Sequence, residues 1–283
     1  MPSQSISGAR EHAKIIVVIP TYNEADNLPG LVAELHALAV PGLSILVVDD
    51  NSPDGTGSVA DALAERLPGV LQVRHRETKD GLGRAYIEGF KLALGAGADL
   101  VVQMDADFSH PPQTIITMLG LMQNYDVVVG SRYVSGGQLD ERWSWWRRFL
   151  SWWANEIWSR RILGLNVRDI TAGFKCWRGS TLAGIGLDRV ISNGYAFQVE
   201  MAFLTEQLGY RVKEIPIYFE DRRIGKSKMS VPVKLQGAVD VFRIRYRHRK
   251  AMAQAAGRPV PQSQVAVQGM PAAVPSNDHA TDI

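Results

Sequence analysis

The sequence predicts an α/β fold with a mostly parallel sheet flanked by helices on both faces, and three observations support this prediction. Short, largely apolar runs alternate with longer stretches that have the period of amphipathic helices. Such alternation is typical of parallel strands joined by crossover helices. Polar clusters follow the first, second and fourth apolar runs, and parallel sheets bind ligands beyond the carboxyl ends of their strands. With 283 residues and 46% hydrophobic content, the chain can bury the core of such a fold.

The elements follow in order along the first half of the chain. The expected strands are short runs of mostly apolar residues, over 14–19, 44–48, 70–74, 99–104 and 126–129. The expected helices lie between them and have one apolar face, over 27–38, 58–67, 82–94 and 112–123. The second half predicts a helix over 195–208, a strand-like segment over 211–219 and a helix from 232 to about 246.

We interpret residues 14–250 as a single domain. Residues 1–13 are polar and predict a flexible N-terminus, whereas residues 251–283 lack aromatic residues and helical periodicity, which predicts a disordered tail. No run resembles a signal peptide or approaches the ~20 apolar residues of a membrane span. The single cysteine, Cys176, cannot form an intramolecular disulfide, which favours a reducing, cytoplasmic compartment.

Composition and missing motifs argue against several classes of function. A formal net charge of +2 gives no support for binding nucleic acid. No Gly-x-Gly-x-x-Gly motif follows the first strand and no phosphate-loop motif occurs, so dinucleotide-dependent redox chemistry and phosphate-loop hydrolysis both lose support.

Two short motifs at the expected sheet edge are open to more than one interpretation. Asp105 and Asp107 follow an apolar run and could hold a metal-bound diphosphate, although an acidic pair after a strand is more often a turn or a helix cap. Gly81 and Gly83 open the third predicted helix. These two glycines are equally consistent with a flexible helix start and with close approach of the backbone to a phosphate.

Six of the seven tryptophans fall between Trp143 and Trp158, among several arginines. This segment could pack on the main domain or on a second copy of the chain. Amphipathic rings mixed with cations also suit a helix lying on a membrane surface, which we favour. The arginines over 243–250 form no single stripe, so we expect a solvated helix end there.

Taken together, the motifs resemble those of family 2 glycosyltransferases of the GT-A fold, most closely the polyprenol-phosphate (dolichol-phosphate) mannosyltransferases. The resemblance covers roughly residues 14–230 and implies the GT-A sheet with amphipathic interface helices towards the C-terminus. It is carried by VIPTYNE at 18–24, VVDDNSPDGT at 47–56, GLG at 81–83, MDAD at 104–107, GSRY at 130–133, DITAGF at 169–174, GYAFQVE at 194–200 and FEDR at 219–222.

The resemblance implies inverting transfer of mannose from GDP-mannose to a polyprenyl phosphate, assisted by Mg²⁺ or Mn²⁺. A divalent cation would stabilise the negative charge that grows on the departing diphosphate. The lipid phosphate is already an anionic nucleophile, so a general base is unnecessary. The partners expected on this basis are the nucleotide sugar, the lipid and the cytoplasmic face of a membrane, where the protein would be peripheral. A separate membrane-anchoring protein stays an open alternative.

The resemblance also assigns roles to individual residues. The implied catalytic residues are Asp105, Asp107, Arg132 and Asp169. The implied donor-binding residues are Pro20, Tyr22, Glu24, Val48, Asp50, Asp105, Ala106, Asp107, Arg222 and Lys228. The implied acceptor-phosphate residues are Arg132, Arg147 and Ser151, and the implied metal ligands are Asp105, Asp107 and Ser109.

Some of these roles have alternatives. Ser109 stands where relatives can carry a third ligand, but it could instead cap the next helix. Asp169 and Glu200 could orient sugar hydroxyls or could pair with internal arginines. At the level of the whole protein, one alternative is the same fold with another donor, such as UDP-glucose, or with another acceptor. The other is a non-catalytic membrane adaptor that binds nucleotide sugars.

Overall fold

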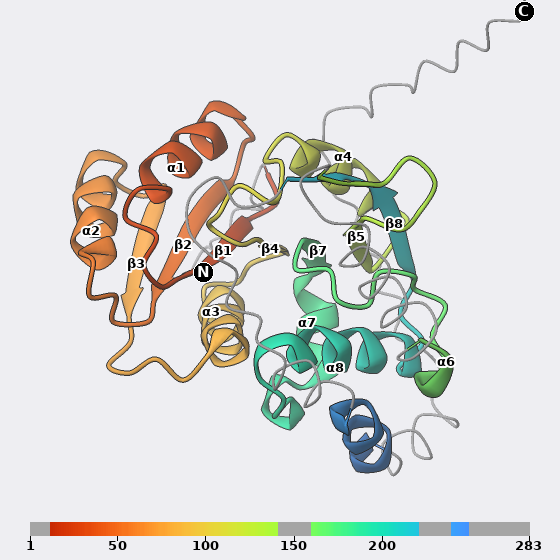
Figure 1. Cartoon of the computed structure of the whole chain (residues 1–283). Coiled ribbons are helices and arrows are strands. Elements are labelled where there is room, and N and C mark those ends of the chain that lie inside the picture. Colours follow the sequence, from red (N-terminus) through yellow and green to blue (C-terminus); the bar gives the residue numbers. More distant parts are fainter. Residues whose placement is uncertain (1–11, 141–159, 221–238, 249–283) are drawn as a thin grey trace, which may run out of the picture.

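The computed structural model describes residues 12–140, 160–220 and 239–248 (Figure 1). The expectations for Arg147, Ser151, Arg222 and Lys228 lie outside the described residues, as do those for most of the tryptophan-rich segment and for the C-terminal tail. Within the described part of the chain, no helix is long and apolar enough to cross a lipid bilayer.

A seven-stranded sheet forms the centre of the fold, with the strand order β3-β2-β1-β4-β7-β5-β8. Every neighbouring pair is parallel except those formed by β7, which runs antiparallel to both β4 and β5. The seven strands are β1 (Ile15–Thr21), β2 (Leu43–Asp49), β3 (Leu71–His75), β4 (Leu100–Gln103), β5 (Val127–Ser131), β7 (Lys175–Arg178) and β8 (Val212–Pro216). Two short strands, β6 (Gln138–Leu139) and β9 (Tyr218–Phe219), pair beside it.

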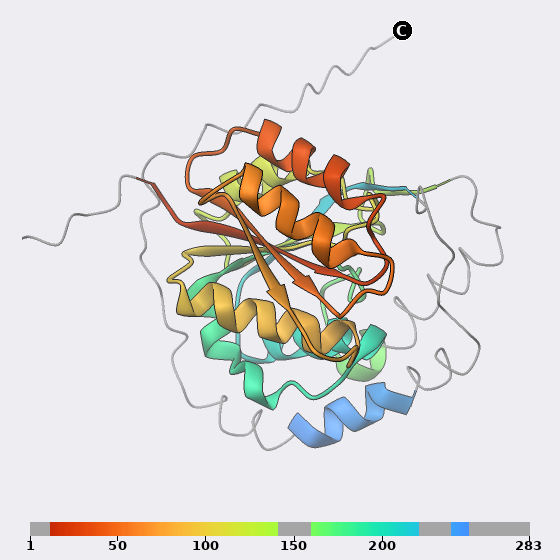
Figure 2. The same ribbon diagram turned by 90° about the vertical axis from the view of Figure 1, so that its left-hand side faces the viewer.

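Helices cover both faces of the sheet (Figure 2). Along β1, Ile15, Val17 and Ile19 enter one apolar cluster and Ile16 and Val18 enter the other, because alternate side chains of a strand point to opposite faces. The first cluster is covered by α1 (Leu28–Ala37), α2 (Thr56–Arg66) and α4 (Thr114–Leu121). The second is covered by α3 (Leu82–Gly95), α7 (Gly179–Ile185) and α8 (Gly194–Gln207). The remaining labelled pieces are α6 (Arg160–Leu163) and a 3-10 turn at Leu187–Arg189.

The predicted fold class is confirmed, as are the five strands and four helices of the first half, whose ends shift by only a few residues. The strand-like segment at 211–219 divides into β8 and β9. Strand β7 was not predicted, because it has only two apolar residues, Cys176 and Trp177, and these lie between the charged residues Lys175 and Arg178. Both charged side chains are nonetheless buried.

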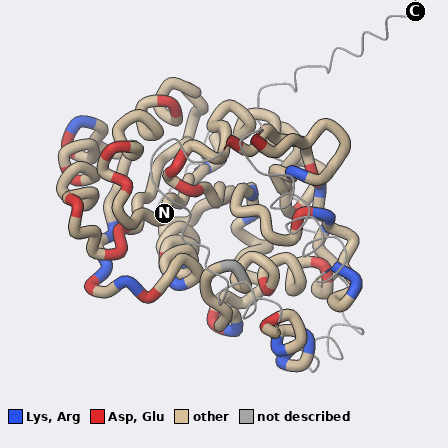
Figure 3. The backbone as a smooth tube through the Cα atoms, viewed as in Figure 1, with Lys and Arg blue, Asp and Glu red and all other residues tan. Residues whose placement is uncertain are grey.

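Residues 239–248 form a helix that packs on the main domain. Val241 and Ile244 join Phe203, Val199 and other residues in a third apolar cluster. His248 is also buried, with Nε2 2.7 Å from Glu200 Oε1. The expectation of a solvated helix end is confirmed for Arg243, Arg245 and Arg247, which are exposed, but not for His248. Basic residues of this helix are visible in Figure 3.

Candidate active site

The loops after β1 and β2 are joined at the carboxyl edge of the sheet. Thr21 Oγ1 donates to Asp49 Oδ1 at 2.9 Å, and the backbone N–H of Glu24 donates to Thr56 Oγ1 at the same distance. Pro20 and Val48 are paired in the parallel register of the two strands. The predicted donor-binding residues of these loops are thus neighbours in space.

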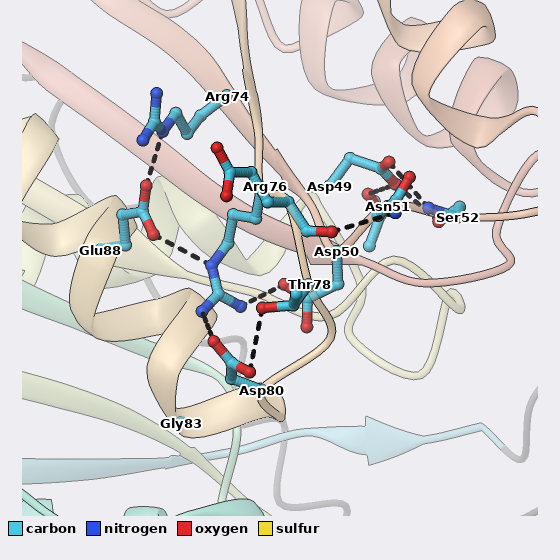
Figure 4. A network of polar contacts seen from close by, with 12 residues as sticks. Asp49, Asp50, Asn51, Ser52, Arg74, Arg76, Thr78, Asp80, Gly83 and Glu88 are labelled. Atoms are coloured by element: carbon cyan, nitrogen blue, oxygen red, sulfur yellow. Dashed lines mark hydrogen bonds and ion pairs between the residues drawn. The ribbon is translucent and has the colours of Figure 1, made fainter.

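Asp50 is buried at this edge and forms an ion pair with Arg76, which follows β3. Figure 4 shows Arg76 between Asp50, Asp80 and Glu88. Arg76 also forms ion pairs with Asp80 and Glu88, and its Nε lies 2.9 Å from Glu88 Oε2. Burial raises the pKa of Asp50 more than the Arg76 hydrogen bond and charge lower it. Arg76 was not predicted, because the sequence does not distinguish an exposed arginine from an arginine that is buried as the counter-ion of a carboxylate.

Tyr22 is half-buried, and the ammonium of Lys79 lies 3.4 Å from the centre of its ring. This cation–π contact joins the loop after β1 to the loop before α3. The predicted packing of the ring on a nucleoside stays a prediction.

Asp105 follows β4 and is held from two sides. Tyr86 of α3 donates its hydroxyl to Asp105 Oδ1 at 2.6 Å, and the backbone N–H of Asp105 donates to His110 Nδ1 at 3.1 Å. His110 is stacked on Phe174, with ring centres 5.1 Å apart. Burial lowers the pKa of His110, so its Nδ1 is an acceptor at neutral pH. The sequence analysis named neither Tyr86 nor His110.

Asp107 is held by Ser109. Both the backbone N–H and the hydroxyl of Ser109 donate to Asp107 Oδ1, at 3.1 and 2.6 Å. Helix α4 begins later, at Thr114, and its N-cap residue Gln113 makes no side-chain cap. The alternative that Ser109 caps the next helix is therefore wrong, and its predicted metal ligation stays a prediction.

The surroundings of Asp105 and Asp107 fit a divalent cation that prefers oxygen ligands. A Cβ atom at Gly173 would lie 3.2 Å from Asp105 Oδ2, so glycine keeps space beside this carboxylate. Within the described residues, no group of three or more His, Cys, Asp or Glu side chains could hold a metal by itself. Two carboxylates completed by phosphate and water oxygens are the usual protein environment of Mg²⁺.

Arg132, just after β5, forms a buried bidentate ion pair with Asp169. Its Nε lies 2.8 Å from Oδ2 and its Nη2 lies 2.7 Å from Oδ1 of that carboxylate, while Nη2 also donates to Thr171 Oγ1. Burial alone would raise the pKa of Asp169, but the charge and hydrogen bonds of Arg132 outweigh it, and the pKa lies below its ordinary value. The structure therefore shows the internal-pairing alternative for Asp169.

Glu200 also has internal partners. Its Oε2 accepts the backbone N–H groups of Ile191 and Ser192, and its Oε1 lies within hydrogen-bonding distance of Arg247 and His248. These contacts join α8 to the helix at 239–248.

The glycines at the start of α3 serve a helix contact. The N–H of Gly83 donates to Asn193 Oδ1, which is also the N-cap acceptor of α8. A Cβ atom at Gly83 would lie 3.0 Å from both Phe197 Cβ and Ser192 O. Gly83 thus allows close packing between two helix N-termini, and its own N–H already has an acceptor. Approach of a phosphate to the rest of this turn stays a prediction.

The chain was compared with known proteins. It matches the family described as "Glycosyl transferase family 2" over residues 16–180. It is 47% identical to undecaprenyl-phosphate mannosyltransferase of Micrococcus luteus, over 81% of this chain and 93% of that protein. It is 45% identical to polyprenol monophosphomannose synthase of Mycolicibacterium smegmatis, over 78% of this chain and 83% of that protein.

Solved structures share the fold at low sequence identity. Mannosyl-3-phosphoglycerate synthase from Rubrobacter xylanophilus aligns with a TM-score of 0.60 and 21% identity, covering 84% of this chain and 75% of that one. Glucosyl-3-phosphoglycerate synthase from Mycobacterium tuberculosis, solved with Mn²⁺, UDP and glucosyl-3-phosphoglycerate, aligns with a TM-score of 0.58 and 18% identity, covering 83% and 80%. With the family match and the two relatives, the sheet and its carboxyl-edge motifs identify this chain as a member of glycosyl transferase family 2.

Proposed function

We propose that this protein transfers mannose from GDP-mannose to the phosphate of a polyprenyl lipid. The observation that carries the proposal is the arrangement of Asp105 and Asp107, each with one oxygen held by a neutral donor, at the sheet edge next to the joined loops of Tyr22 and Asp50. Support for the sugar and the acceptor comes from the two relatives, which are named for mannosyl transfer to undecaprenyl phosphate and for synthesis of polyprenol monophosphomannose.

In this proposal Asp105 and Asp107 hold Mg²⁺ or Mn²⁺ against the donor diphosphate. When bound, the cation supplies a Lewis acid that stabilises the charge of the leaving nucleotide. Solved relatives of the same fold contain Mn²⁺ or Mg²⁺ together with UDP, which supports use of a divalent cation. Ser109 then holds Asp107, and its hydroxyl oxygen keeps lone pairs with which it could also ligate the cation, as proposed.

Pro20, Tyr22, Glu24, Val48 and Asp50 form the proposed nucleoside side of the site. Arg132 is the proposed cation between the two phosphates. Its bond to Asp169 holds the guanidinium in place, so we propose for Asp169 the role of positioning Arg132 rather than direct contact with the sugar. Arg222 and Lys228 for the diphosphate, and Arg147 and Ser151 for the acceptor phosphate, complete the proposed set.

The acceptor phosphate carries negative charge at neutral pH and needs no general base. Attack on the anomeric carbon from the face opposite the diphosphate inverts that centre. Because the acceptor is a lipid, the protein must reach a membrane surface, and we propose peripheral binding at the cytoplasmic face.

The test is an assay of purified protein with radiolabelled GDP-mannose, a short polyprenyl phosphate and either Mg²⁺ or Mn²⁺. We expect labelled lipid, its loss on addition of EDTA, and a raised acceptor KM in Arg147→Ala. Labelled lipid from UDP-glucose alone would favour the same fold with another donor. Nucleotide binding without transfer to any lipid would favour the non-catalytic adaptor.

A further inference from the structure

Tyr86 of α3 lies beneath Asp105, and nothing in the proposed function uses it. Its hydroxyl donates to Asp105 Oδ1 at 2.6 Å, and the whole side chain is buried.

The groups that form this bond determine its direction. A carboxylate that binds a cation can only accept, so the one proton of the phenol is committed to Asp105 Oδ1, 2.6 Å away.

The ring of Tyr86 has little freedom to turn. It is fully buried and stacks between Phe197 and Phe90, with ring centres 5.8 and 5.6 Å away. A buried hydroxyl on a fixed ring, with its one proton given to one acceptor, holds its carboxylate partner in a single orientation.

We infer that Tyr86 is a positioning residue for the metal–diphosphate site: with its ring packed between Phe90 and Phe197, its phenol holds Asp105 Oδ1 and leaves the second oxygen of this carboxylate to the divalent cation. This inference rests on the proposed function, because it assumes that Asp105 binds the cation. Residues that orient metal ligands typically change metal affinity or activity by roughly 10- to 100-fold when they are replaced.

The test measures Mn²⁺ binding in the presence of GDP, by the electron paramagnetic resonance signal of free Mn²⁺, in wild type and Tyr86→Phe. We expect roughly 10-fold weaker Mn²⁺ binding and an unchanged KM for the lipid phosphate. Tyr210→Phe is the matched control, since it removes the hydroxyl of a different, partly buried tyrosine, and it should bind Mn²⁺ like wild type. If Tyr86→Phe fails to fold, Phe197→Leu takes its place, because it keeps the phenol and removes a ring that stacks on it.

A double-mutant cycle separates positioning from general damage to the fold. In the Asp105→Asn background, Tyr86→Phe should cause no further loss of Mn²⁺ binding, because the carboxylate through which Tyr86 acts is gone. Additive losses, or equal Mn²⁺ affinity of Tyr86→Phe and wild type, would overturn the inference while the transferase assay still stands. If wild type makes labelled lipid but binds no Mn²⁺ with GDP, the inference falls together with the metal part of the proposal. If wild type makes no labelled lipid yet binds Mn²⁺ and Tyr86→Phe does not, the inference holds and the proposed acceptor or donor is wrong.

Discussion

Arg132 and Asp169 form a bidentate ion pair, 37 residues apart in sequence, in which both partners are buried at the carboxyl end of β5. Two hydrogen bonds to the carboxylate come from the guanidinium and a third comes from the backbone N–H of Arg132. The pair therefore orients a cation that would otherwise be free to turn, at the point where the donor diphosphate is proposed to bind.

Replacing Asp169 by Asn should destabilise the fold by roughly 3–5 kcal/mol, because it leaves a buried arginine without its counter-charge. Urea unfolding followed by circular dichroism measures this. Asp188→Asn is the matched control, since it removes an exposed partner of Lys91, and it should leave the unfolding midpoint unchanged. If Asp169→Asn lowers the free energy of unfolding no more than the control does, the ion pair contributes little to stability.

The same pair predicts a pH dependence of stability. The pKa of Asp169 is lower in the folded protein than its ordinary value of 3.8, so its contribution is fully present above about pH 4 and is lost as the pH falls through the folded-state pKa. Unfolding free energies measured from neutral to acid pH should therefore fall more steeply in wild type than in Asp169→Asn. If the unfolding free energies of the two proteins change with pH in the same way, the pKa of Asp169 is not lowered in the folded protein.

Asp107→Ala should lower the rate of sugar transfer by at least roughly 100-fold while the protein stays folded, since it removes a carboxylate from the proposed diphosphate site. Ser109→Ala should have a smaller effect, because the backbone N–H of residue 109 still donates to Asp107. Labelled lipid formation and the circular dichroism spectrum check both variants. Full turnover in a folded Asp107→Ala would remove this residue from the site.

Arg76→Met should raise the KM for the donor about 10-fold or more and leave the acceptor KM unchanged, because Asp50 loses the cation that pairs with it. Arg74→Met is the matched control. Arg74 binds the same Glu88, at 2.5 Å, but its side chain is half exposed. Steady-state kinetics with each substrate varied in turn distinguishes the two, and equal effects would indicate that only the bond to Glu88 matters.

Gly83→Ala should destabilise the protein by about 1–3 kcal/mol, because the new methyl group would meet Phe197 and the carbonyl of Ser192. Gly95→Ala in the same helix should stabilise it by about 0.5–1 kcal/mol, since nothing lies within 4 Å of that position and alanine favours the helix. Thermal melting measures the stability of both variants. We expect a lower melting temperature for Gly83→Ala and a higher one for Gly95→Ala. An unchanged melting temperature in Gly83→Ala would argue against close packing of α3 on α8.

Much of the fold could be predicted from the sequence because each element has its own local pattern. The continuous apolar run of β1 and the apolar face of α3 are visible in short windows, and the parallel arrangement follows from the order of such elements. Strand β7 could not be predicted in this way. Its charged ends, Lys175 and Arg178, look like solvent-exposed residues until the sheet closes over them.

The residues of the candidate site also differ in whether local sequence could predict them. Asp105 and Asp107 were found because they follow directly after a strand, where local order predicts the carboxyl edge. The residues that hold Asp105 were not found, because Tyr86 has the sequence context of an ordinary core aromatic. The partner of Asp50 was missed for a similar reason, since nothing in the sequence shows that Arg76 pairs with this carboxylate.

The sequence by itself determined which segments become strands and helices and which carboxylates stand at the edge of the sheet, because those properties depend on neighbouring residues. Only the tertiary structure decided the partners: Asp105 with Tyr86 from 19 residues away, and Gln103 with Gln198 from 95 residues away. The physical reason is that a buried polar group must find a hydrogen-bond partner wherever the chain brings one, and that choice is made by packing across the whole fold.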